Sequence, residues 1–201
     1  GSNNIEATQE EITSLYRDSN PKSYDASLVD AADISALNLK DARSYLGEKT
    51  DRQILDGDLY DLMERKQFIK GVEGRYKPTV AGLLLFGTNP QIFLPYAKIK
   101  AEVKFDDEGK DWDDLAEIEG NIFEQIKGAE SFLRRNIKTS ARIVGFERVE
   151  QLEIPIEALR EAIVNALVHR DYTKTGSETF LRIRKNNVLI ENPGGLIPPL
   201  T

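Results

Sequence analysis

The residues with the clearest chemical potential lie in one short segment, residues 161–172. If this segment is a helix, Glu161, Asn165 and His169 follow one another four residues apart and share one face. A carboxylate can orient or deprotonate water, and an amide oxygen is a suitable ligand for Mg²⁺ beside a phosphate. The spacing therefore predicts a magnesium–phosphate site. The alternative is a solvated polar face that ends in a hydrogen-bonded histidine.

The helix that must carry these side chains is predicted over residues 155–172. Pro155 suits its first turn, where a missing amide hydrogen leaves no hydrogen bond unmade. Two small residues, Ala158 and Ala162, border the polar stripe and leave room beside it for a ligand. The core-facing side is predicted to consist of apolar residues at helical spacing: Ile156, Leu159, Ile163, Ala166 and Leu167.

A hairpin and a glycine turn follow this helix. Residues 180–185 and 188–191 are predicted strands, joined through Asn186-Asn187, and the second strand leads into Asn192-Pro193-Gly194-Gly195. Adjacent glycines allow a backbone to approach a ligand closely, although such a sequence also simply ends a strand in a tight turn. We therefore include Asn192, Gly194 and Gly195 in the candidate site.

Together, Glu161-x-x-x-Asn165 and the strand followed by a glycine turn resemble the N-box and first glycine box of the GHKL (Bergerat-type) ATPases. More closely, the chain is similar to the ATPase-like domain of RecG-related transcriptional regulators. The similarity lies in residues 79–87 (TVAGLLLFG), 158–172 (ALREAIVNALVHRDY) and 191–196 (ENPGGL), and it extends over residues 58–201. It implies a truncated GHKL-like two-layer α/β sandwich with a mainly antiparallel sheet.

The resemblance also implies ATP and Mg²⁺ as cofactors of the full-length protein. Glu161 would be the general base or water-orienting carboxylate, and Asn165 would be the Mg²⁺ ligand. Asn192, Gly194 and Gly195 would lie near the adenine end of the nucleotide. First glycine boxes of GHKL proteins normally carry an aspartate and alternating glycines, whereas the two glycines here are adjacent. The alternative is thus a non-catalytic regulatory or oligomerisation module that retains the fold without ATP chemistry.

His169 could have either of two roles, and it also belongs to a short sequence that matches a kinase motif by chance. His169-Arg170-Asp171 imitates the catalytic loop of protein kinases, but no glycine-rich phosphate loop precedes it and no Asp-Phe-Gly follows. We therefore treat the kinase motif as coincidental. His169 either hydrogen-bonds a phosphate of the nucleotide or holds the helix end, where an imidazolium meets favourable carbonyl dipoles. We favour the second role.

The rest of the chain predicts an α+β fold in two parts. Helices are expected near residues 8–16, 39–46 and 58–68, and Thr79 is expected to cap a short buried helix that ends at Phe86. Residues 1–90 would then form a helical linker or a small winged-helix-like segment. Residues 91–201 would form the incomplete GHKL ATPase-like domain.

Periodicity predicts the first elements of this second part. Residues 97–105 and 115–119 alternate as strands with one buried face. Asn121 and Glu124 form a capping-box signal for a helix. The apolar stripe of that helix is Ile122, Ile126, Ala129, Leu133 and Ile137. Residues 142–152 are expected to form one strand with a bulge at Gly145.

Composition limits the classes of function. The 201 residues carry a net charge of −7 and no cysteine, which argues against a general binder of phosphate backbones and excludes disulfides and thiolate metal sites. We expect DNA to be bound through domains outside this chain, with a homodimer as a further assembly and no membrane association. The expected location is cytoplasmic. Gly1-Ser2 resembles a tag remnant, so we expect the chain to be a fragment that is inactive by itself.

Overall fold

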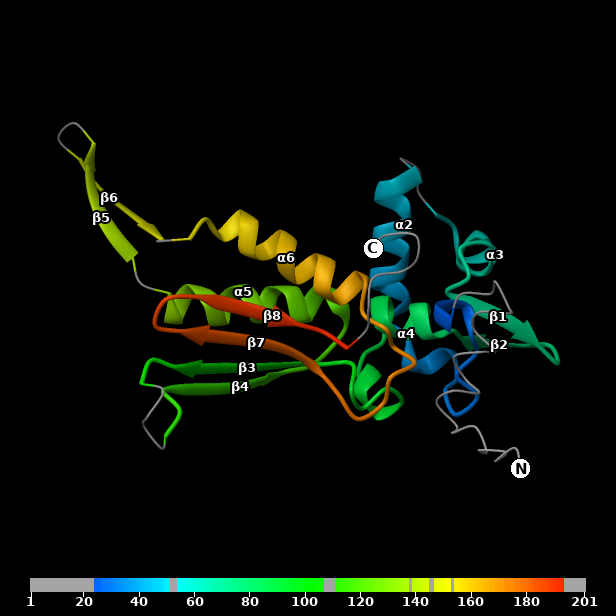
Figure 1. Cartoon of the computed structure of the whole chain (residues 1–201). Coiled ribbons are helices and arrows are strands. Elements are labelled where there is room, and N and C mark those ends of the chain that lie inside the picture. The colour runs from blue at the N-terminus through cyan, green and yellow to red at the C-terminus, as the bar shows by residue number, and fades with distance from the viewer. Residues whose placement is uncertain are drawn as a thin grey trace, which may run out of the picture.

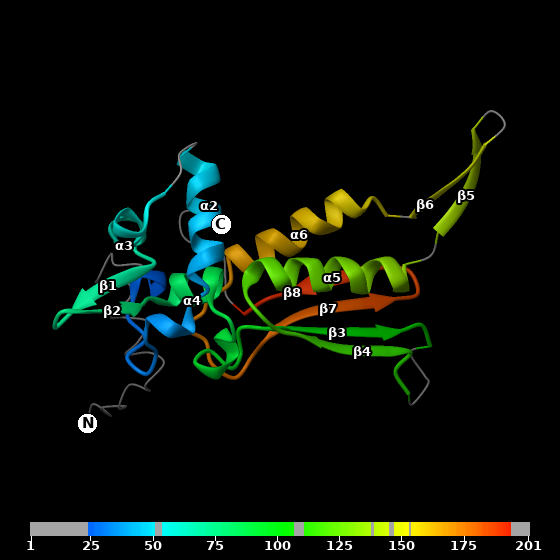
Figure 2. The same ribbon diagram turned by 180° about the vertical axis from the view of Figure 1, so that it is seen from behind.

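Residues 24–50, 54–106, 111–137, 139–144, 147–152 and 154–193 are described by the computed structural model. The fold is α+β, as predicted, with a largely helical N-terminal region and a mixed four-stranded sheet (Figure 1). Figure 2 shows from behind that helices α5 and α6 lie on the same face of this sheet. The helix predicted at residues 8–16, together with Gly194 and Gly195, lies outside the described residues.

The N-terminal region contains short helices and one hairpin. The 3₁₀ turns are η1 (Tyr24–Ala26), η2 (Ile34–Ala36) and η3 (Pro90–Ile92). The helices are α2 (Leu39–Thr50), α3 (Asp56–Arg65) and α4 (Val80–Phe86). Strands β1 (Ile69–Val72) and β2 (Arg75–Pro78) pair antiparallel between α3 and α4. This hairpin was not predicted. Its two turn residues, Glu73 and Gly74, have φ of 50° and 76°, the left-handed conformation that such tight turns require.

Helix α4 begins as predicted at its threonine cap. The Thr79 hydroxyl accepts a hydrogen bond from the Gly82 amide at 3.1 Å and donates one to the carbonyl of Gln67 at 2.7 Å. Gly82 lies against the backbone of Phe68, whose carbonyl oxygen is 2.0 Å from the position that a Cβ on Gly82 would occupy. The close contact of α4 with the end of the α3–β1 turn therefore requires glycine at this position.

The four-stranded sheet has the order β4-β3-β7-β8. Strands β3 (Ile99–Lys104) and β4 (Asp114–Ile118) form one antiparallel hairpin, and β7 (Thr179–Arg184) and β8 (Val188–Glu191) form another. The two hairpins meet where β3 pairs parallel with β7, with Ile99 opposite Thr179. Alternate residues of the central strands are buried, as the period of two predicts.

Helices α5 (Ile122–Asn136) and α6 (Ile156–Val168) cover the buried face of the sheet (Figure 1). The predicted capping box is present in α5: the Asn121 side chain accepts from the Glu124 amide at 3.1 Å, and the Glu124 carboxylate accepts from the Asn121 amide at 2.8 Å. The predicted stripe of α5 lies in the core. The buried residues that the two helices contribute are Ile126, Ala129, Phe132, Leu133, Leu159, Ile163 and Leu167.

A separate hairpin joins the two helices. Strands β5 (Thr139–Val144) and β6 (Glu147–Leu152) pair antiparallel and project away from the sheet in both views (Figures 1 and 2). The prediction of a single strand over residues 142–152 was wrong, because the backbone reverses and places Arg142 opposite Val149. The chain therefore reverses between Val144 and Glu147, and the predicted bulge residue Gly145 itself lies outside the described residues.

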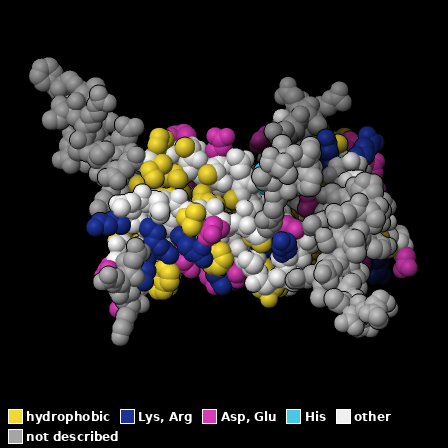
Figure 3. Space-filling model, in the orientation of Figure 1, with side chains coloured by type: hydrophobic (Ala, Val, Ile, Leu, Met, Phe, Trp, Pro, Cys, Tyr) yellow, Lys and Arg dark blue, Asp and Glu magenta, His cyan; other side chains and the backbone are white. Residues whose placement is uncertain are grey.

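The outer face of the sheet is a solvated surface crossed by ion pairs. Arg182 pairs with Glu102 at 3.0 Å and with Glu191, which lie on the two neighbouring strands. Figure 3 shows basic side chains over β7 and β8, next to apolar side chains. The guanidinium of Arg182 also lies 4.1 Å from the centre of the Phe180 ring. Arg182 and Arg184 therefore lie on the partly solvated face of the β7–β8 hairpin.

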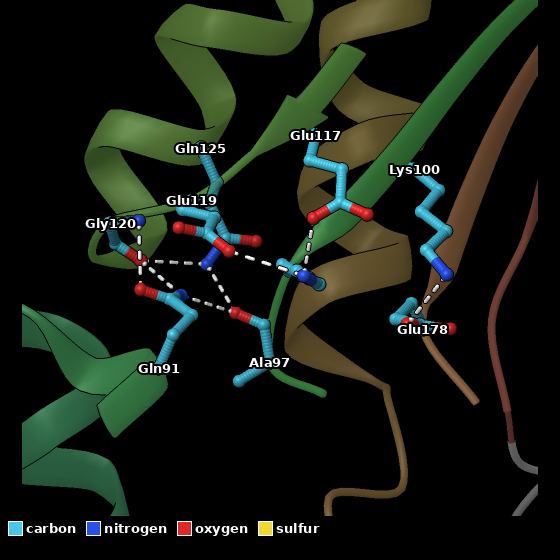
Figure 4. A network of polar contacts seen from close by, with 9 residues as sticks. Gln91, Ala97, Lys100, Glu117, Glu119, Gly120, Gln125 and Glu178 are labelled. Carbon is cyan, nitrogen blue, oxygen red and sulfur yellow. Dashed lines mark hydrogen bonds and ion pairs between the residues drawn. The ribbon is translucent and has the colours of Figure 1, made fainter. Parts of the chain in front are cut away.

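Two side-chain amides, the half-buried Gln91 and the buried Gln125, connect the N-terminal region to the sheet and α5 (Figure 4). Gln91 on η3 and Gln125 on α5 both donate to the carbonyl oxygens of Ala97 and Gly120, at distances from 2.6 to 2.9 Å. Gln91 also accepts from the Gly120 amide at 3.0 Å. Each carbonyl is therefore bonded twice, once from each side of the junction.

This sharing predicts non-additive losses of stability. Gln125→Leu should reduce the free energy of unfolding by about 1 kcal/mol, because Gln91 still satisfies both carbonyls. Gln91→Ala combined with Gln125→Leu removes all these donors, so the double variant should lose about 1–2 kcal/mol more than the sum of the single losses. Urea unfolding of the four proteins measures this coupling. Additive losses would show that the carbonyls find other donors.

Candidate functional site

Helix α6 presents the predicted polar stripe on its exposed side. Leu159, Ile163 and Leu167 are buried against the sheet and α5, which turns the opposite side of the helix outward. The side chains of Glu161, Asn165 and His169 lie on that outward side and are exposed, as are the small residues Ala158 and Ala162. The amphipathic pattern of α6 thus fixes the direction of all three polar groups.

The described part of the fold makes no use of these three side chains. Within the described ranges, Glu161, Asn165 and His169 form no side-chain hydrogen bond and no ion pair. The adjacent Arg160, by contrast, donates to the Glu130 carboxylate at 3.0 Å, which ties α6 to α5. A carboxylate and an amide one helical turn apart are therefore available to an external ligand.

His169 terminates α6. Its backbone amide donates to the Asn165 carbonyl at 2.9 Å, and its φ of −96° and ψ of 8° mark the last residue of the helical path. The imidazole lies at the helix end, where a positive charge interacts favourably with the last carbonyls. The backbone of His169 makes this cap, and within the described ranges its side chain takes no part in a hydrogen bond.

The end of β8 is fastened to the same end of α6. The Asn192 side-chain nitrogen donates to the Ala166 carbonyl at 3.1 Å, and the Asp171 amide donates to the Pro193 carbonyl at 3.0 Å. Asn192 therefore lies beside the helix turn that carries Asn165, although its own amide nitrogen serves the fold. Gly194 and Gly195 continue from this point outside the described residues.

Two residues that follow the stripe turn inward. Arg170 is 6 % exposed, and its Nη2 donates to the Ser177 carbonyl at 2.8 Å. The Tyr172 hydroxyl donates to the Leu167 carbonyl at 2.8 Å, and the guanidinium of Arg170 lies 5.1 Å from the centre of the Tyr172 ring. Burial raises the pKa of Tyr172 and lowers the pKa of Arg170. The sequence gives no signal for the burial of Arg170, since a charged residue after a helix end is usually solvated.

The side-chain oxygens of the stripe are suited to a Mg²⁺ ion that is also bound by the phosphates of a substrate. The described side chains do not form a metal site by themselves. Among the described residues, no group of three or more His, Cys, Asp or Glu side chains could hold a metal ion. Mg²⁺ commonly takes one or two protein oxygens and completes its shell with water and substrate phosphates. The exposed Asn165 amide fits that requirement, with the Glu161 carboxylate one turn away.

Comparison with known protein families gives a match to one part of the chain. Residues 13–100 match the model of a family described as a domain of unknown function (DUF8451). The matched segment ends at the beginning of β3 and does not contain α6. Neither the curated proteins nor the solved structures give a match to the chain. In the described part of the chain, no helix is both long and apolar enough to cross a membrane.

Proposed function

We propose that this chain is a piece of a RecG-related transcriptional regulator whose ATPase-like domain links nucleotide binding to regulation. The observation that carries the proposal is the exposed pair Glu161 and Asn165, which no described residue engages. The bond from Asn192 to the Ala166 carbonyl supports it, because it brings the start of the glycine turn to the same end of α6. A truncated GHKL-like sandwich would need these two segments side by side.

Each residue has a distinct role in this proposal. The Asn165 side-chain oxygen would be a ligand of Mg²⁺, and the ion would neutralise charge on the phosphates of ATP. Glu161 would accept a hydrogen bond or a proton from the attacking water. Asn192, Gly194 and Gly195 would lie near the adenine, and His169 would cap the helix rather than bind phosphate.

A non-catalytic regulatory or oligomerisation module is the second candidate. The adjacent glycines and the absence of the usual aspartate favour it. The engagement of the Asn192 amide nitrogen within the fold also favours it, since that group is then not free to read the adenine. DNA binding through domains outside this chain, a homodimer and a cytoplasmic location belong to both candidates.

Nucleotide binding distinguishes the two candidates. Titration of the full-length protein with a non-hydrolysable ATP analogue and Mg²⁺ is expected to show saturable, magnesium-dependent binding in an isothermal calorimeter. Asn165→Ala should weaken this binding by about tenfold or more, because it removes the protein oxygen from the ion. The control is Asn186→Ala, which changes an exposed amide in the turn between β7 and β8. No detectable binding by the wild-type protein would overturn the ATPase proposal and leave the non-catalytic module.

A further inference from the structure

A cavity of about 100 Å³ lies between the segment that precedes β3 and the loop that follows α6. It is separate from the exposed stripe on α6. Its polar lining consists of Tyr24, Tyr96, Arg170, Tyr172, Lys174 and Thr175, and the remainder of its wall is apolar. The cavity has room for several water molecules but is smaller than pockets that hold drug-sized ligands. It therefore suits one small organic molecule.

Arg170 lines this cavity and carries a buried charge whose hydrogen-bond donors are only partly used by the described part of the fold. Of its nitrogens, Nη2 donates to the Ser177 carbonyl at 2.8 Å and Nη1 reaches the Thr179 hydroxyl only at 3.4 Å. Its Nε is buried and has no hydrogen-bond partner. A guanidinium has five N–H donors, and leaving a buried donor unpaired destabilises a protein. The side chain is thus incompletely satisfied by the fold alone.

The carboxylates around Arg170 are committed elsewhere. Glu178 acts on Arg170 electrostatically but forms its ion pair with Lys100 at 2.9 Å (Figure 4). Asp171 accepts hydrogen bonds at one carboxylate oxygen from the amide and the hydroxyl of Thr173. Within the described ranges, no carboxylate lies within ion-pair distance of Arg170. A buried guanidinium without such a partner is suited to an external anion.

The walls of the cavity define the class of that anion. Arginine matches the planar, two-oxygen geometry of a carboxylate, and tyrosine rings provide apolar surface beside it. Lys174 lies at the exposed rim and adds a second positive charge. We propose that this cavity binds a small monocarboxylic acid, with its carboxylate on Arg170 and its hydrocarbon body against Tyr24, Tyr96 and Tyr172. This inference is independent of ATP binding at α6.

Such a ligand would contact two segments that are far apart in the sequence but adjacent in the fold. Tyr24 and Tyr96 precede β3, whereas Arg170 and Tyr172 follow α6 directly after His169. Tyr24 and Tyr172 also pack against the small apolar cluster of Val80, Leu84 and Ala97. Occupation of the cavity would therefore stabilise the contact between the N-terminal region and the end of α6.

The test uses benzoate and its neutral analogue benzamide. Isothermal titration of the protein with benzoate is expected to show saturable binding, and benzamide should bind at least about tenfold more weakly because it lacks the charge. Inorganic phosphate should not compete with benzoate at equal concentration. Absence of saturable benzoate binding, equal binding of benzamide, or preference for phosphate would each overturn the proposal.

Two variants locate the binding. Arg170→Gln should weaken benzoate binding at least about tenfold in protein that circular dichroism shows to be folded. Lys174→Gln changes only the exposed rim, keeps the core intact and should weaken benzoate binding measurably. Its matched control is Lys185→Gln, an exposed lysine at the turn after β7, which should leave the affinity unchanged. If Lys174→Gln and Lys185→Gln bind benzoate alike, and folded Arg170→Gln binds it as the wild type does, the ligand does not occupy this cavity.

Discussion

Glu161→Gln in the full-length protein is expected to lower the turnover of ATP by about 100-fold or more, with little change in nucleotide affinity. The substitution keeps the size of the side chain and removes its ability to accept a proton from water, a contribution of about 10²–10⁴ in rate for a positioned base. Glu161 is exposed and no described residue engages it, so the fold should not change. The loss should therefore appear in kcat and not in KM.

Steady-state hydrolysis of ATP by the full-length protein measures this effect. The control is Glu157→Gln, which removes the same charge from an exposed residue one turn earlier on α6. This variant should hydrolyse ATP at the wild-type rate. Equal rates for the wild type and Glu161→Gln would remove Glu161 from the catalytic role, and equal losses in the two variants would point to net charge instead.

Gly82→Ala is expected to lower the free energy of unfolding by about 3 kcal/mol. The new methyl group would begin 2.0 Å from the Phe68 carbonyl oxygen, well inside contact distance. This oxygen accepts a hydrogen bond from the Thr79 amide and lies 3.1 Å from the Thr79 hydroxyl, so moving it also disturbs the cap of α4. Neither partner is a flexible side chain that could move aside. For a chain of this size, the loss corresponds to a fall in Tm of about 6–12 °C.

Thermal and urea unfolding measure this loss, with Gly57→Ala as the matched control. Gly57 lies in α3, and a Cβ added there would meet nothing within 4 Å. Alanine is favoured over glycine in a helix by about 1 kcal/mol, so the control should be slightly more stable than the wild type. A Gly82→Ala protein as stable as Gly57→Ala would show that α4 can move away from Phe68 without cost.

Local patterns in the sequence predicted the elements that local forces determine. The stripe and the capping box of α5 and the alternation in β3 depend on residues close together in the sequence, and the structure has all three. The exposed stripe on α6 follows from the same amphipathic pattern. The burial of Arg170 and the bond from Asn192 to Ala166 depend on packing between distant segments, which periodicity does not encode.

The missed hairpins have the same cause. Strands β1 and β2 are four residues long and partly exposed, so their alternation is too weak to distinguish them from a turn. The break at Gly145 suits either a bulge or a chain reversal, and only the cross-strand pairing of β5 with β6 decides between them. Sequence patterns thus located the interruptions of regular secondary structure but did not specify the strand pairing on either side of them.

The parallel seam between β3 and β7 also bears on the order in which the chain folds. Each outer pair, β3–β4 and β7–β8, closes over a short connection, whereas Glu102 and Arg182 meet across the seam at a separation of 80 residues. Contacts of such separation are slow to form, because the loop must close before the contact contributes any stability. Both helices of the core lie within that loop, so we expect them to form before the sheet is complete. We therefore expect the cavity beside Arg170 to take its final form late, when β7 joins β3.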